Sequence, residues 1–188
     1  MNKLGHLTAT GLLARDLPRR HRFCLKLGSL LPDLLVFTYV GGHTWDSTRD
    51  KTARRMLRLE DTGRESCLSY LRLGYILHYV EDYFTYPHNS WYPGTLSEHG
   101  IYELSLTAYA RRQGAADADD IQPLRSAQAL MDRLAEAHGE YAQQTPGVEN
   151  DFAYLMSAAG QVSDYYVQVF RRHETEHTLV LHPAEKLN

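Results

Sequence analysis

Ten histidines stand out in this 188-residue chain, because several of them come with acidic residues at intervals that suit a metal ion. His78 and Asp82 are four residues apart, and so are His99 and Glu103. On a helix, residues at this interval share one face, with Cβ atoms about 5–6 Å apart, so both side chains can hold one metal ion. His88 lies between the two pairs, in a segment bounded by prolines. The pattern predicts a metal site.

Three residues further upstream are candidates for the same site. Asp33 follows a proline, His43 lies in a glycine-rich loop, and His6 opens the first predicted helix. Taken one by one, each also fits an ordinary role as a turn aspartate, a solvated loop histidine or an exposed terminal histidine. Buried charges need partners, and a metal ion is one such partner. The candidate ligands are therefore His6, Asp33, His43, His78, Asp82, His88, His99 and Glu103.

The elements that must position these residues all read as helices. Apolar side chains recur at helical spacing, and no segment alternates as a strand does. The predicted helices cover residues 6–17, 21–31, 47–60, 65–84, 97–112, 123–144 and 149–173. We expect Pro32 to end the second helix. Asp46 or Ser47 is expected to cap the third helix, and Ser97 the fifth.

Length and composition favour a single soluble domain. A chain of this length corresponds to one domain, and 43% hydrophobic with 23% charged residues excludes a disordered protein. We predict an all-α, single-domain bundle of about six to eight helices over residues 1–188, with a loosely ordered tail over about 178–188. The net charge of -3 disfavours an extended nucleic-acid surface, which needs clustered basic residues.

The compartment is expected to be the cytoplasm. No apolar run approaches the roughly 18 residues of a transmembrane helix, and no secretory signal is visible, although a removed leader would make the protein secreted. Cys24 and Cys67 are far apart and form no C-x-x-C motif. We expect two buried thiols in a reducing compartment rather than a disulfide framework or a zinc knuckle.

Residues 78–89 resemble the signature of the zinc-dependent phospholipase C family. In that signature an Asp follows the first His by four residues, and a second His follows the Asp by six. His78, Asp82 and His88 match both intervals. The histidine–glutamate pair downstream is similar to the family's later ligand pair. Weaker likenesses at residues 6–7, 28–33, 43–46 and 158–170 extend the resemblance over nearly the whole chain.

The resemblance implies the all-α phospholipase C/P1 nuclease fold, built around zinc ions that hydrolyse phosphate esters. It implies three ligand groups: Asp33, His43, His78 and Asp82 for one zinc ion, His88, His99 and Glu103 for a second, and His6 with bridging Asp82 for a third. Two zinc ions are expected, and a third if the His6 group binds one. Asp33 would be the catalytic carboxylate that orients or deprotonates water.

The chain departs from the family pattern at a few positions. Glu81 stands where Gly or Thr is usual, and Pro87 directly precedes His88. The two spacers between ligands are shorter than in the secreted enzymes. In those enzymes the N-terminal amine helps to bind the third zinc ion, and here Met1 lies shortly before His6.

The expected activity is that of a phosphodiesterase that uses zinc-activated water on a small phosphoester or a phospholipid headgroup. Zinc lowers the pKa of a bound water to about 7, which suits hydrolysis at neutral pH. A nuclease or nucleotidase on the same scaffold is an alternative, favoured by aromatic residues near the motif but not by the acidic charge. A metal-binding structural protein without turnover is another. Oligomeric state stays open.

Overall fold

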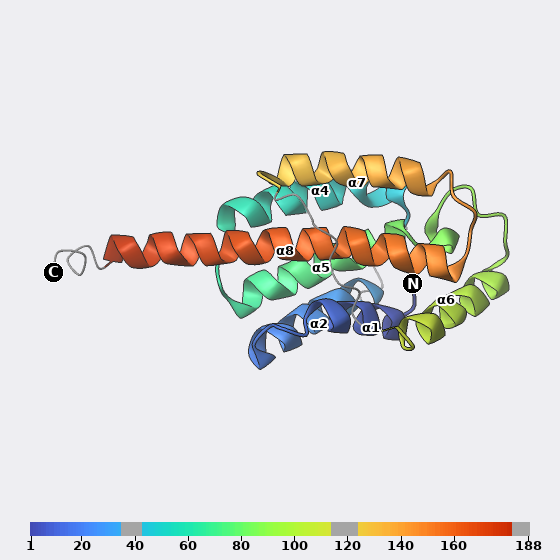
Figure 1. Ribbon diagram of the computed structural model, residues 1–188, viewed down its shortest axis with the longest axis horizontal. Helices are drawn as coiled ribbons and strands as arrows, with labels where there is room; N and C mark the ends of the chain where they lie inside the picture. Colours follow the sequence, from blue (N-terminus) through green and yellow to red (C-terminus); the bar gives the residue numbers. More distant parts are fainter. Residues whose placement is uncertain (35–42, 114–123, 182–188) are drawn as a thin grey trace.

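Seven α-helices make up most of the computed structural model, which describes residues 1–34, 43–113 and 124–181 (Figure 1). In chain order they are α1 (Lys3–Leu13), α2 (Arg19–Leu34), α4 (Trp45–Thr62), α5 (Cys67–Tyr83), α6 (Leu96–Ala110), α7 (Ala127–Tyr141) and α8 (Val148–Leu181), and the short 3-10 helix η1 (Tyr86–His88) follows α5. These ranges contain no strand, so the predicted all-α bundle is confirmed. No helix within them is long and apolar enough to span a membrane.

The helix α5 lies at the centre of the bundle. In Figure 1 it runs beside α8, with α4 and α7 on one side and α1 and α2 on the other. Leu73, Leu77 and Val80 on α5 are fully buried. A helix that is apolar on most sides, rather than along one stripe, belongs in a core. The polar side chains of His78 and Asp82, on the same helix, are therefore carried into the interior.

Three helices, α2, α4 and α8, are longer than predicted, and α4 gains two residues at each end. α2 runs through Pro32 instead of ending there. Near a helix end a proline removes a single backbone hydrogen bond, and packing of α2 along α5 offsets that loss. α8 continues past His173, because no proline or glycine follows in the sequence before Pro183. Residues 178–181 of the predicted loose tail are thus helical, and residues 182–188 lie outside the described part.

The predicted N-caps of α4 and α6 are wrong by two or three residues. The capping residues are Thr44 and Thr95, not Asp46, Ser47 or Ser97. The Thr44 hydroxyl accepts the backbone N–H of Ser47 at 3.3 Å, and Thr95 takes part in a complete capping box. Each threonine supplies the acceptor that the free N–H groups of a first turn require. These caps set where α4 and α6 begin, next to candidate ligands.

The helices α2 and α5 cross closely at two glycines. A side chain at Gly74 would collide with the carbonyl oxygen of Leu25, and one at Gly28 with the carbonyl oxygen of Leu71. Backbones can approach this closely only where no Cβ intervenes. The glycine pair therefore brings the backbone of α2 within reach of side chains on α5.

The two cysteines also join these helices. Cys24 on α2 and Cys67 on α5 form a disulfide, with Cα atoms 5.5 Å apart. The expectation of two free thiols is therefore wrong. The residues are distant in sequence, so their spacing gave no sign of the pairing, which follows from the packing of α2 against α5.

We predict that Gly74→Ala destabilises the protein by about 1–3 kcal/mol, because the added methyl group forces the two backbones apart. Gly139→Ala on α7 is the matched control, since no atom lies within 4 Å of a Cβ there. The control should be more stable than wild type by about 0.5–1 kcal/mol. Urea unfolding measures both values, and equal stabilities for the two variants would contradict the close crossing.

Candidate metal centre

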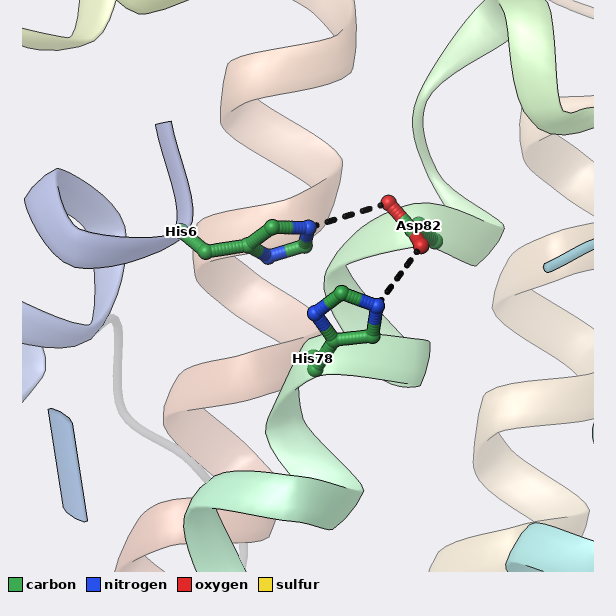
Figure 2. Close-up of side chains that lie close together, drawn as sticks. All are labelled: His6, His78 and Asp82. Atoms are coloured by element: carbon green, nitrogen blue, oxygen red, sulfur yellow. Dashed lines mark ion pairs between the residues drawn. The ribbon is translucent and has the colours of Figure 1, made fainter. Parts of the chain in front are cut away.

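Asp82 stands at the centre of the candidate site. Its carboxylate is fully buried near the C-terminal end of α5. One oxygen, Oδ2, lies 3.2 Å from Nδ1 of His43, 3.3 Å from Nε2 of His78 and 3.6 Å from Nδ1 of His88. The other, Oδ1, lies 3.3 Å from Nε2 of His6. Figure 2 shows His6 and His78 approaching the carboxylate from two helices.

The first ligand group combines α2, the start of α4 and α5. Ligand atoms of Asp33, His43 and His78 all lie within 4.8 Å of one another. Nδ1 of His78 lies 2.9 Å from the backbone carbonyl of Ser29, made accessible by the glycine crossing. A carbonyl oxygen can only accept, so Nδ1 carries the proton and Nε2 faces the site. Asp33 Oδ1 lies 3.9 Å from that Nε2 atom.

The second ligand group joins η1 to the start of α6. Nε2 of His88 and Nε2 of His99 each lie 3.0 Å from Oε1 of Glu103. The three ligand atoms lie within 4.8 Å of one another. His88 belongs to the single turn of η1, and the cap of α6 places His99 in its first helical turns. His99 and Glu103, four residues apart on α6, thus lie beside His88 from η1.

The third group lies at the start of α1. Ligand atoms of His6, His78 and Asp82 come within 4.8 Å of one another, so His78 stands closer to this group than the resemblance implied. The buried amine of Met1 pairs with Asp82 and lies 2.8 Å from Nε2 of His88 and 3.2 Å from Oε1 of Glu103. Burial lowers the pKa of this amine, but the Asp82 and Glu103 carboxylates outweigh burial and raise it, so the amine is a cation between the groups.

The structure thus brings all eight predicted ligands together. They come from four of the helices, from η1 and from the residues before α4. Their assignment as metal ligands stays a prediction, as does the catalytic role of Asp33. Two other described histidines lie elsewhere: His21 stacks on Tyr70, and His173 contacts the carbonyl oxygen of Gly63.

The charges of the cluster put Asp82 and His78, but not His6, in the protonation states that metal ligands need. Burial alone would raise the pKa of Asp82, but His88, the Met1 amine and His78 outweigh it and hold that pKa well below its usual value. Burial also holds the pKa of His78 well below normal. For His6, burial is outweighed by the Asp82 carboxylate, which raises the pKa to about 9. Asp82 is ionised and His78 neutral, as coordination requires.

The donor atoms suit zinc. Imidazole nitrogens and carboxylate oxygens are ordinary zinc ligands, and each group offers three of them. Nε2 of His6 is buried, and its partner is the Asp82 carboxylate, 3.3 Å away. A cation could bind between this nitrogen and the carboxylate oxygen, because both are ordinary zinc ligands.

A cavity of about 700 Å³ opens beside the cluster. Asp33, His43, His88, His99 and Glu103 line it, so the first two groups are accessible from outside. Beside Asn2, Lys3 and Thr44, its other lining includes the exposed large hydrophobic side chains of Leu4, Leu96 and Leu104. The cavity therefore has a floor of candidate ligands and a rim that is partly apolar.

Sequence reasoning missed residues that hold the ligands in place. Glu81 is buried, and its Oε2 lies 2.6 Å from Nδ1 of His6. Its acidic side chain beside Asp82, where Gly or Thr is usual, was the signal that pointed to it. Nε2 of His138 on α7 lies 3.0 Å from the side-chain oxygen of Asn89, which follows His88. No sequence pattern connected that histidine to the site.

Comparison with known proteins agrees with the site. Residues 5–147, most of the chain, match the sequence profile described as zinc-dependent phospholipase C. The match includes all eight candidate ligands and ends shortly before α8. Among curated proteins and among solved structures, no match to this chain was found.

His138 gives a prediction for the dependence of stability on pH. Burial lowers its pKa from 6.5 to about 4, so the unfolded chain binds one more proton between these values. Stability present above pH 6.5 is thus lost on acidification. Between pH 6.5 and 4.5 the wild type should lose about 1 kcal/mol per pH unit more than His138→Gln, which cannot titrate. Urea unfolding across this range tests it, and parallel pH profiles would contradict the buried, neutral imidazole.

Proposed function

Because the chain belongs to the zinc-dependent phospholipase C family, whose members are zinc-dependent hydrolases, we propose that it hydrolyses a phosphodiester beside Asp82. The observation that carries this proposal is the meeting of eight candidate nitrogen and oxygen donors beside one open cavity, which five of them line. A purely structural metal site would be closed to solvent, whereas a catalytic one keeps positions open.

The ligand groups assign the zinc ions as follows. Asp33, His43 and His78 would hold one ion with Asp82, and His88, His99 and Glu103 would hold another. His6 and Asp82, with the amine of Met1 close by, would hold a third. We propose two firmly held ions and a weaker third, because the third group shares His78 and Asp82 with the first.

The residues around the cavity have different proposed roles in hydrolysis. Zinc, when bound, supplies Lewis-acid chemistry that polarises a phosphoryl oxygen and makes an attacking water more acidic. Asp33 is half-buried at the cavity, and burial raises the pKa of its carboxyl. A carboxylate with a raised pKa is the better acceptor for the proton that the attacking water loses. Lys3 adds a cation at the cavity for the phosphate.

The apolar rim favours a phospholipid over a nucleic acid. A phospholipid places its phosphate next to alkyl chains, and the cavity places exposed Leu4, Leu96 and Leu104 next to the ligands. A single-stranded nucleic acid needs aromatic stacking platforms. The described aromatic residues near the motif, such as Tyr83 and Trp91, do not line this cavity.

His78→Ala and Asp82→Ala should each lower the zinc content and abolish phosphodiesterase activity. Both remove a donor from the centre of the cluster, and removal of zinc with a chelator should have the same effect on activity. Elemental analysis and a chromogenic phosphodiester provide the two measurements. His177→Ala, at an exposed position on α8, is the control and should match wild type. Unchanged zinc and turnover in both variants would refute the proposal.

The rim gives a separate prediction about the substrate. Leu96→Ser and Leu104→Ser should slow hydrolysis of phosphatidylcholine more than that of a soluble chromogenic diester, because only the lipid needs apolar contacts. Initial rates on both substrates and on single-stranded DNA test this. Preferred cleavage of DNA would favour the nuclease alternative, and zinc without turnover on any phosphoester would favour a structural protein.

A further inference from the structure

Glu81 is a buried carboxylate that none of the three ligand groups uses. It lies on α5 beside Asp82, and its side chain is fully buried. Its Oε2 lies 2.6 Å from Nδ1 of His6, and its Oε1 accepts the hydroxyl of Thr10 at 3.1 Å. His6 and Thr10 are one turn apart on α1. Both carboxylate oxygens are therefore engaged by α1 rather than directed to the metal-binding atoms.

This contact determines how His6 faces the cluster. A carboxylate can only accept, so Nδ1 of His6 carries a proton, and Nε2 is the nitrogen left for a metal ion. That Nε2 lies 3.3 Å from Oδ1 of Asp82. The ring also stacks on His78, with centroids 4.0 Å apart. Glu81 and His78 together hold the imidazole in one orientation.

His78 is oriented by a different kind of hydrogen-bond partner, and the comparison shows what the charge of Glu81 contributes. The partner of His78 is a neutral backbone carbonyl, that of Ser29, at 2.9 Å. A carboxylate partner makes a stronger, charge-assisted hydrogen bond and makes the imidazole a more basic ligand. It also adds a negative charge next to Asp82, where another divalent cation would add positive charge. Both effects favour a metal ion at His6.

We infer that Glu81 is a positioning residue that gives the His6–Asp82 pair its affinity for the third metal ion. The inference rests on the proposed function, because it requires a zinc cluster at Asp82. It assigns a role to an acidic residue at a position where the family signature has Gly or Thr. Neither sequence spacing nor membership of the family assigns that role.

The test compares zinc binding by Glu81→Ala and Glu81→Gln with wild type. Glu81→Ala removes the acceptor, so the most weakly held zinc ion should bind about 10–100-fold less tightly while the others are retained. Glu81→Gln keeps an acceptor without the charge, so its loss should be smaller. Competition with a chromophoric chelator, with elemental analysis after dialysis, measures the affinities. Glu60→Gln is the matched control, because Glu60 accepts hydrogen bonds from Ala127 and Tyr165 instead.

A spectroscopic measurement separates positioning from mere stability. In the zinc-loaded wild type, nitrogen-15 NMR should show His6 protonated at Nδ1 and metal-bound through Nε2, and Glu81→Ala should lose this pattern. If Glu81→Ala does not fold, the isosteric Glu81→Gln carries the test. Equal zinc affinities in wild type and in the folded Glu81 variants would overturn the inference and leave the proposed function standing. A wild type that binds no zinc would overturn both.

Discussion

The buried carboxylate of Asp82 is the constraint on which the structure depends. A charge taken out of water destabilises a fold unless partners surround it. Four histidines and the amine of Met1 meet this one group, and they come from α1, α5, η1 and the segment before α4. The elements of one half of the bundle must therefore converge on a single point. The same histidines that surround the charge of Asp82 also form a candidate site for cations.

The convergence needs a rigid frame, and α2 with α5 provides it. The glycine crossing lets a backbone carbonyl of α2 hold His78, while Glu81 on α5 holds His6 on α1. Each of these two histidines is thus oriented by a partner behind it, and each presents its other nitrogen to Asp82. Outer partners of this kind fix both the tautomer and the direction of a ligand. The helices α2 and α5, with Glu81 and the Ser29 carbonyl, are therefore part of the site together with the candidate metal ligands.

The all-α fold class and the ligand pairs within one helix could be predicted from sequence, because both depend on residues that are close together in the sequence. His78 with Asp82, and His99 with Glu103, follow from the helical repeat alone. The role of Glu81 could not, since its partner His6 is 75 residues away. Pro32 was expected to end a helix, but tertiary packing overrode that local rule. The pairing of Cys24 with Cys67 likewise depends on the packing of α2 against α5, which the spacing of the two cysteines in the sequence does not indicate.

The disulfide between Cys24 and Cys67 has a consequence for the unfolded chain. It closes a ring over a sequence separation of 43, and such a cross-link removes about 4 kcal/mol of conformational freedom from the denatured ensemble. Asp33 and His43 lie within the ring, and His78 lies just beyond it. While the bond is formed, these donors stay near one another even when the helices have melted. The unfolded chain then has fewer conformations to sample before a cation can bind these donors together.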